Sequence, residues 1–195
     1  RFLPSIGNYI YGTSPDALYI NLYLGNEIHY GKNTRKHLKD CSVLTLSGTK
    51  YVLVEFDYFK PIDATEVVYG LIHDGFIPIV AHVERYVYIS INDVLEIKSM
   101  GGLIQVNAGS LVGDVKGRLK RRVKKLIKLS LVDFIASDAH ASRRNYLKSA
   151  YDYVNKKFGN ETANKLFIEN AKKISNNWKQ NSDELYAKII ELMTD

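Results

Sequence analysis

The segment Phe76-Ile77-Pro78-Ile79-Val80-Ala81-His82 (residues 76–82) is a short apolar strand followed directly by a histidine. Four other apolar segments also run into a polar residue: Ile20–Asn26 into Glu27, Tyr51–Val54 into Glu55, Leu103–Val106 into Asn107 and Leu131–Ser137 into Asp138. Where strands alternate with helices in a barrel, side chains at the carboxyl ends of the strands converge on one mouth, and the chemistry is done there. The repeated pattern therefore predicts a metal site assembled from consecutive strands.

Helical patterns separate these strands and predict an α/β fold. Apolar residues recur at helical spacing over Thr65–Asp74, Ile91–Met100, Val115–Leu129, Arg144–Lys157, Asn160–Ile174 and Asp183–Met193. Strand–helix alternation with connections of this length implies a parallel sheet with helices outside it. Residues 1–18 show no such period and are expected to form a loop over the site or a connection. Because no linker divides the chain, we expect a single domain over residues 1–195.

The composition excludes several classes of protein. The chain has 195 residues, 46% of them hydrophobic, and its longest apolar run is far shorter than the ~20 residues of a membrane-spanning helix. No charged segment followed by an apolar segment suggests an export signal. The single cysteine, Cys41, cannot form an internal disulfide, which is typical of the cytoplasm. It is also not expected to be a phosphatase nucleophile, because position 47 is Ser47 rather than the arginine that a thiolate phosphatase requires.

The net charge of +6 comes from one predicted helix. Its basic residues are Lys116, Arg118, Lys120, Arg121, Arg122, Lys124, Lys125 and Lys128. Three interpretations fit this amphipathic segment, Lys116–Lys128: a solvated outer face, a membrane-proximal or acidic-protein docking surface, and a nucleic-acid site. Nucleic acid is the least expected partner, because no aromatic residues interleave with the charges to stack on bases.

The candidate ligands combine carboxylates and imidazoles. Asp138-Ala139-His140 is the sharpest local signal, since a strand that ends in Asp-x-His presents an oxygen and a nitrogen donor on one loop. The expected set is Glu27, Glu55, His82, Asp138 and His140. Repulsion between clustered carboxylates is usually relieved by divalent cations, and this mixture suits Mn, Fe or Zn better than Ca.

Residues next to these ligands predict a phosphate site. Arg85 follows His82 by three positions, and Arg143 and Arg144 follow His140, so two loops could hold a phosphate between guanidinium groups. Glu84 is expected to orient His82. The segment Asn107–Ser110 reads equally as a turn that offers N–H groups to an oxyanion and as a plain loop, while His29, His37 and His73 are expected to be structural or exposed.

Together these motifs resemble the polymerase and histidinol phosphatase (PHP) superfamily. More narrowly, they resemble the manganese-dependent protein-tyrosine phosphatases of capsule and exopolysaccharide loci in Gram-positive bacteria. The matching segments are Gly25–Ile28, Val54–Phe56, Ala81–Tyr86, Gln105–Leu111 and Ala136–His140. The resemblance implies a distorted TIM-like (β/α) barrel of the PHP type, with the N-terminal strands expected to lie outside the sequence given.

The resemblance also implies a chemistry and a partner. It assigns metal binding to Glu27, Glu55, His82, Asp138 and His140, and phosphate binding to Arg85 and Arg144. The implied cofactor is Mn²⁺, with up to three divalent ions and with Fe or Zn as alternatives. The implied reaction is hydrolysis of phosphotyrosine by an activated water, without a covalent intermediate. The implied substrate is the tyrosine-rich tail of a bacterial tyrosine kinase, so the activity would regulate capsular or exopolysaccharide synthesis.

Two departures from the family pattern keep other functions open. Val83 stands where the family usually has proline, and the N-terminal His-x-His pair, the Asp after it and a further His are not found in this chain. We expect the sequence to be incomplete. The alternatives are a PHP-type phosphatase acting on a small molecule such as histidinol phosphate, and a non-catalytic regulatory protein on the same scaffold.

Overall fold

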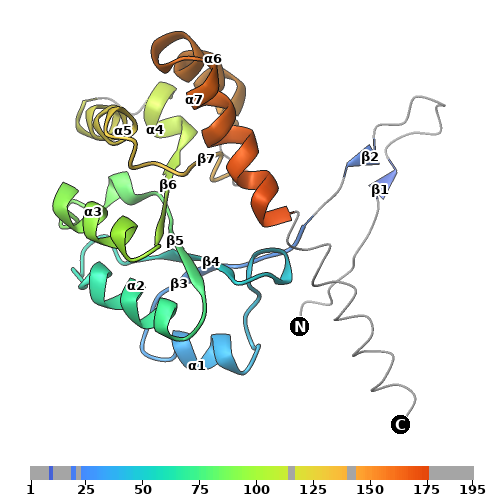
Figure 1. Ribbon diagram of the computed structural model, residues 1–195, viewed down its shortest axis with the longest axis vertical. Helices are drawn as coiled ribbons and strands as arrows, with labels where there is room; N and C mark the ends of the chain where they lie inside the picture. Colours follow the sequence, from blue (N-terminus) through green and yellow to red (C-terminus); the bar gives the residue numbers. More distant parts are fainter. Residues whose placement is uncertain (1–8, 11–18, 21–22, 114–116, 140–143, 176–195) are drawn as a thin grey trace.

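A parallel β-sheet forms the centre of the computed structural model, which describes residues 9–10, 19–20, 23–113, 117–139 and 144–175 (Figure 1). In these residues the sheet has the order β3 (Glu27–His29), β4 (Tyr51–Glu55), β5 (Ile77–Val80), β6 (Leu103–Asn107) and β7 (Phe134–Ala136). Each strand pairs in parallel with the next one in the chain, so their carboxyl ends lie at one edge. The α/β prediction is confirmed, and within the described residues the sheet is open, with β3 and β7 at its edges.

Helices connect the strands on the outside of the sheet (Figure 1). They are α1 (Thr34–Lys39), α2 (Ala64–His73), α3 (Ile91–Ser99), α4 (Ala108–Val112), α5 (Arg118–Lys128), α6 (Leu147–Phe158) and α7 (Asn160–Asn164), which continues into the π-helix η3 (Lys165–Glu169). Two short 3₁₀ turns, η1 (Leu46–Gly48) and η2 (Val83–Arg85), precede β4 and follow β5. Of the described helices, none is both long and apolar enough to cross a bilayer.

Local side-chain chemistry explains where α2 and α3 begin and end. The Asp63 carboxylate accepts hydrogen bonds from two backbone N–H groups at the start of α2, and Ser90 forms a capping box with Asp93 at the start of α3. Past their last turns, Gly75 and Gly101 have φ values of 90° and 97°, a conformation that glycine adopts without strain. Both helices lie within one residue of their predicted bounds.

Within the strand predicted over Ile20–Asn26, residues 23–26 form no strand, and β3 begins at Glu27. Residues just before β3 instead form hydrogen bonds with the loop that leads into η1. Asn26 N donates to the Leu44 carbonyl at 3.1 Å, and Leu44 N donates to Asn26 Oδ1 at 2.7 Å. Glu27 is therefore the first residue of a strand rather than the residue after one.

Other boundaries also differ from the predictions. Part of the segment expected to lack regular structure forms β1 (Tyr9–Ile10), which pairs antiparallel with β2 (Tyr19–Ile20). Strand β7 is shorter than predicted, α6 begins three residues after Arg144, and helix α4 starts where a turn or a loop was expected after Asn107. The helix predicted over Asp183–Met193 lies outside the described residues.

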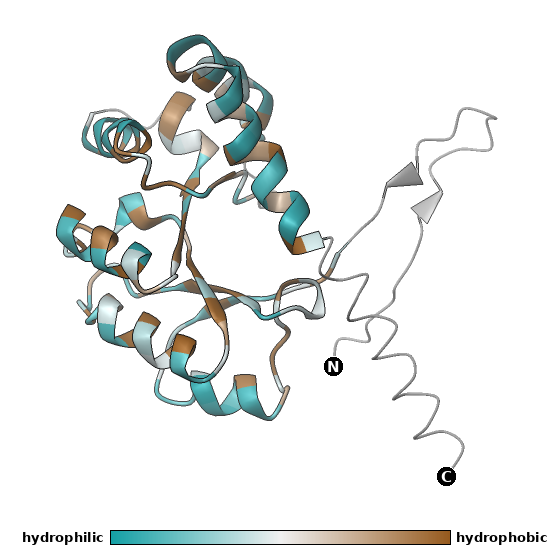
Figure 2. Ribbon diagram, viewed as in Figure 1, coloured by the Kyte–Doolittle hydropathy of each residue, from teal (hydrophilic) through white to brown (hydrophobic). Residues whose placement is uncertain are grey.

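The two faces of the sheet have different surroundings. Figure 2 shows hydrophobic residues along the central strands, and α2 and α3 pack against β5 and β6. On the helix-covered face, Val54, Val80 and Val106 are completely buried. On the other face, Gln105 lines a cavity of about 400 Å³ that reaches from Glu27 to Asp138. Two of the predicted ligands, Glu27 and Asp138, therefore line this cavity.

Candidate metal centre

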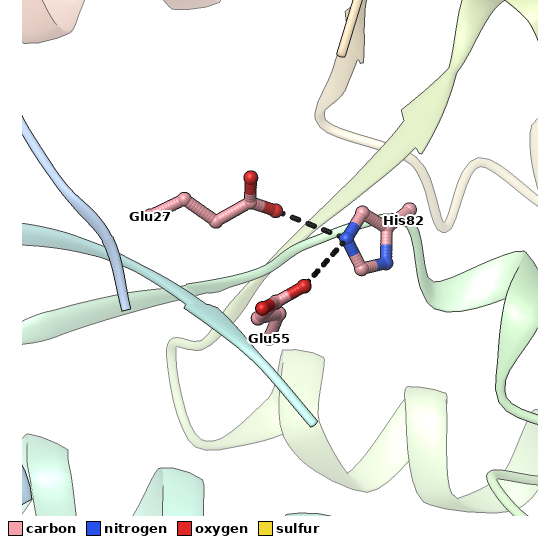
Figure 3. Close-up of side chains that lie close together, drawn as sticks. All are labelled: Glu27, Glu55 and His82. Atoms are coloured by element: carbon pink, nitrogen blue, oxygen red, sulfur yellow. Dashed lines mark ion pairs between the residues drawn. The ribbon is translucent and has the colours of Figure 1, made fainter. Parts of the chain in front are cut away.

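Three predicted ligands converge on one point at the carboxyl edge of the sheet (Figure 3). His82 Nε2 lies 3.0 Å from Glu27 Oε1 and 3.4 Å from Glu55 Oε2, and the three ligand atoms all lie within 4.8 Å of one another. The imidazole is almost inaccessible, with 2% of its side chain exposed, whereas the two carboxylates are about one third exposed. Two carboxylate oxygens and one imidazole nitrogen are a donor set that fits Mn, Fe or Zn.

The strands position these three side chains in different ways. Glu27 and His29 alternate with Ile28 along β3, so they share one face of the strand. The last residue of β4, Glu55, is paired with His29, which brings it to the same side. His82 follows β5 with φ 30° and ψ 50°, a left-handed conformation that is strained for histidine and that turns the chain into η2.

The other nitrogen of His82 contacts a tyrosine. Tyr86 Oη lies 3.1 Å from His82 Nδ1 and accepts a 2.9 Å hydrogen bond from Phe56 N. Tyr86 is completely buried, and this burial raises its pKa well above the usual range, so it stays a neutral phenol. The prediction that Glu84 orients His82 is wrong, because Glu84 Oε1 instead accepts a hydrogen bond from Asn107 N at 3.1 Å.

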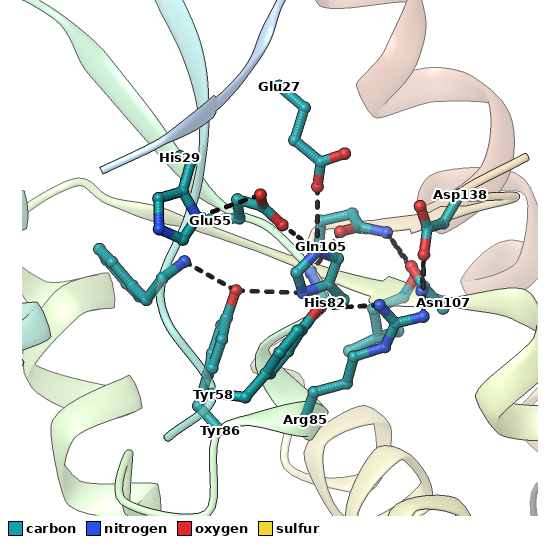
Figure 4. A network of polar contacts seen from close by, with 12 residues as sticks. Glu27, His29, Glu55, Tyr58, His82, Arg85, Tyr86, Gln105, Asn107 and Asp138 are labelled. Atoms are coloured by element: carbon teal, nitrogen blue, oxygen red, sulfur yellow. Dashed lines mark hydrogen bonds and ion pairs between the residues drawn. The ribbon is translucent and has the colours of Figure 1, made fainter. Parts of the chain in front are cut away.

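Asp138 and Arg85 form a second part of the site (Figure 4). Arg85 Nη2 donates to Asp138 Oδ2 at 2.8 Å, and Arg85 Nη1 donates to the Tyr58 hydroxyl at 2.9 Å. Asn107 Nδ2 also donates to Asp138 Oδ2, at 2.7 Å. Burial alone would lower the pKa of Arg85, but Tyr58 and the Asp138 carboxylate raise it above its usual value. The guanidinium therefore stays charged although only 25% of the Arg85 side chain is exposed.

Gln105 joins the two parts of the site. Its Oε1 accepts a 2.5 Å hydrogen bond from His82 N, and its Nε2 donates to Asn107 Oδ1 at 2.8 Å. A continuous chain of hydrogen bonds thus leads from the backbone of His82 through two amides to the Asp138 carboxylate and on to Arg85 (Figure 4). Sequence analysis missed Gln105, although a polar residue inside an apolar strand was a signal that could have drawn attention to it.

His29 and Arg144 are among the other predicted residues that the structure describes. His29 is 58% exposed, as expected, but its Nδ1 also lies 3.2 Å from Glu55 Oε1, which the sequence analysis missed. Arg144 is exposed, and its guanidinium lies 5.6 Å from the centre of the Tyr146 ring. His140 and Arg143 lie outside the described residues. Glu27, Glu55 and His82 are thus brought together, with Arg85 and Asp138 beside them.

The fold and the site define an α/β protein with a candidate divalent-metal centre at the carboxyl edge of a parallel sheet. Residues 13–176 match the family model described as capsular polysaccharide synthesis, CpsB/CapC. The chain belongs to this family.

Relatives with this similarity carry names that describe an enzyme. The chain is 34% identical over 171 residues to tyrosine-protein phosphatase CpsB of Streptococcus agalactiae, covering 82% of this chain and 70% of that protein. It is 34% identical over 158 residues to tyrosine-protein phosphatase YwqE of Bacillus subtilis, covering 78% of this chain and 62% of that protein.

A solved structure is similar as well. Its title describes YwqE from Bacillus subtilis and CpsB from Streptococcus pneumoniae as metal-dependent tyrosine phosphatases. It matches with a TM-score of 0.65 and 33% identity over 71% of this chain, and the chain spans 58% of that structure.

Proposed function

We propose that this protein is a metal-dependent tyrosine-protein phosphatase. The observation that carries the proposal is the convergence of Glu27, Glu55 and His82 beside the charged, partly buried Arg85, in a chain of the CpsB/CapC family. The names of the relatives supply the substrate class, and the donor set is what a metal-dependent hydrolase requires.

The proposed metal ligands are Glu27, Glu55 and His82, joined by Asp138 and His140, with Mn²⁺ as the proposed ion. A divalent ion held there supplies a Lewis acid that lowers the pKa of a water and offsets the charge of the phosphoryl oxygens. The carboxylates of Glu27 and Glu55 lie at the rim, where they can be reached from solvent, while His82 forms the floor.

Arg85 is the proposed phosphate-binding group, with Arg144 as a second. The two terminal nitrogens of Arg85 are already oriented by hydrogen bonds to Tyr58 and Asp138. A planar guanidinium can contact two phosphoryl oxygens at once, and a preorganised donor stabilises the charge that develops in the transition state.

The proposal extends to the architecture and the setting of the protein. The open sheet would belong to a distorted TIM-like barrel, and residues 1–195 to one domain. The proposed substrate is the tyrosine-rich tail of a bacterial tyrosine kinase in the cytoplasm. Dephosphorylation of that tail would regulate capsular or exopolysaccharide synthesis, in agreement with the name of the family.

Helix α5 is a proposed membrane-proximal docking surface. Its exposed cations Arg118, Arg121, Lys125 and Lys128 are spaced by three or four residues and so form one row along the helix. Cosedimentation with phosphatidylcholine vesicles that contain phosphatidylglycerol is expected to be salt-sensitive and to be lost when all four are changed to glutamine. Equal binding to neutral vesicles would contradict this role.

The test of the function is release of phosphate from a phosphotyrosine peptide during titration with Mn²⁺, followed by addition of EDTA. Hydrolysis is expected to require Mn²⁺ and to stop with EDTA. Glu55→Gln is expected to lower the rate by about 100-fold because it removes a charged ligand. Glu96→Gln, at an exposed position of α3, serves as the matched control.

Two outcomes would favour the alternatives. Faster hydrolysis of histidinol phosphate than of the peptide would indicate a small-molecule phosphatase. Binding of Mn²⁺ without hydrolysis of either substrate would indicate a non-catalytic regulatory protein.

A further inference from the structure

Through one oxygen atom, Tyr86 contacts the ligand His82 and the backbone of the residue that follows the ligand Glu55 (Figure 4). Its Oη lies 3.1 Å from Nδ1 of His82, the nitrogen that faces away from the two carboxylates. The same oxygen accepts a hydrogen bond from the backbone N–H of Phe56, the residue that directly follows Glu55. A displacement of this hydroxyl would therefore disturb the imidazole and the end of β4 together.

The ring of Tyr86 is held from several sides, so its hydroxyl has little freedom to move. It is completely buried, with the Phe56 ring 5.6 Å away and the Tyr58 ring stacked at 5.5 Å and 22°. Tyr88 lies 5.8 Å away on the same segment. These ring contacts and the complete burial restrict the position of Oη.

The hydroxyl can serve both neutral forms of His82. A phenol has one proton and two acceptor positions, and Phe56 N–H occupies one acceptor position. If the phenol donates to Nδ1, the proton of His82 is on Nε2 and faces Glu27 Oε1 at 3.0 Å. If Nδ1–H donates to the phenol, the lone pair of Nε2 is free to bind an ion. The change between these forms requires that His82 loses the proton on Nε2 and gains one on Nδ1, by exchange with water, and that the phenol O–H bond rotates away from Nδ1.

We propose that Tyr86 is a positioning residue of the metal centre, whose hydroxyl accepts Nδ1–H of His82 and thereby directs Nε2 to the ion while it holds the chain after Glu55. A partner on the second nitrogen commonly fixes the orientation and tautomer of a histidine ligand. Here that partner is a buried tyrosine hydroxyl that also accepts a hydrogen bond from Phe56 N, next to Glu55, so two ligands from different strands depend on it.

Removal of the hydroxyl alone tests this role. Tyr86→Phe is expected to weaken Mn²⁺ binding by about 10–100-fold, measured by calorimetric titration of the 195-residue chain without substrate. Tyr88→Phe is the matched control, because the hydroxyl of Tyr88 donates to the Asp57 carbonyl and does not contact His82. The control is expected to bind Mn²⁺ like the wild type.

A second measurement is made on the wild-type protein, so its result does not depend on how well the variant folds. In wild-type protein labelled with ¹⁵N-histidine and loaded with diamagnetic Zn²⁺, His82 is expected to show a slowly exchanging proton on Nδ1. Tyr86→Phe is expected to lose this protection. The absence of an Nδ1 proton in the loaded wild type would overturn the inference even if the variant fails to fold.

This inference rests on the metal centre of the proposed function, and the remaining outcomes distinguish a failure of the inference from a failure of the proposed function. A lower melting temperature of Tyr86→Phe with unchanged Mn²⁺ affinity would show a merely structural role and would overturn the inference alone. Wild-type protein that binds Mn²⁺ with the protected Nδ1 proton but hydrolyses no phosphotyrosine would overturn the phosphatase alone. No binding of Mn²⁺ by the wild type would overturn both.

Discussion

Replacement of Gln105 by leucine is expected to destabilise the protein strongly although it preserves the volume of the side chain. Gln105 is 5% exposed and sits in the middle of β6. Its amide accepts from His82 N and donates to Asn107 Oδ1 and to the Val106 carbonyl. Leucine fills similar space in this strand but can make none of these hydrogen bonds.

The size of the effect follows from the groups that lose their partner. The substitution leaves His82 N–H and Asn107 Oδ1 buried without the amide of Gln105. Each buried polar group left unsatisfied costs about 1–3 kcal/mol, so the free energy of unfolding is expected to fall by about 2–6 kcal/mol. A domain has about 5–15 kcal/mol in total, so the loss is a large fraction of its stability.

Urea denaturation followed by far-ultraviolet circular dichroism measures this loss directly. Asn92→Leu is the control, because it makes a similar chemical change at an exposed position of α3 and is expected to alter stability by less than about 0.5 kcal/mol. A loss below about 1 kcal/mol for Gln105→Leu would refute the reasoning, since it would mean that the two buried groups find other partners.

Three further predictions test other parts of the structure. Arg85→Lys is expected to lower kcat/KM for a phosphotyrosine peptide by about 100-fold, because lysine cannot make the planar two-point contact, whereas Arg121→Lys on α5 should leave it unchanged. Hydrogen bonds from an arginine and a lysine of α1 hold the pKa of Asp74 below its usual value. The stability that this carboxylate contributes is therefore present above pH ~4 and lost as the pH falls further. In urea titrations between pH 6 and pH 2, the free energy of unfolding of Asp74→Asn should fall less than that of the wild type. Gly102→Ala would place a Cβ 2.7 Å from a core side chain and is expected to lower the melting temperature, while Gly31→Ala, with nothing within 4 Å, should not.

Local sequence signals predicted the elements that depend on local chemistry. The apolar run before His82 and the capping residues Asp63 and Ser90 each act on their immediate neighbours, and the structure has β5, α2 and α3 close to the expected bounds. The parallel arrangement followed from the alternation of strands and helices, since such connections return each strand in the same direction.

Contacts between distant segments could not be predicted in this way. Strand β3 begins at Glu27 because the preceding residues bond to the loop at Leu44, eighteen positions away from Asn26. Gln105 contacts His82, 23 residues away along the chain, only after β5 and β6 have paired. Tyr86 lies only four residues after His82, but its second contact, with the backbone of Phe56, joins segments 30 residues apart. The pairing of Glu84 with Asn107 rather than with His82 depends on the same assembly.

The distribution of the site over the sheet has a consequence for the order of folding. Glu27, Glu55, His82 and Asp138 come from the strand–loop units of β3, β4, β5 and β7, and the hydrogen bond between Arg85 and Asp138 spans 53 residues. Such non-local contacts form slowly, so a nascent or refolding chain has no complete ligand set until the strands have paired. An ion that binds only the assembled ligand set stabilises the native state but not the transition state that precedes it. Metal is therefore expected to slow unfolding while leaving the rate of refolding almost unchanged.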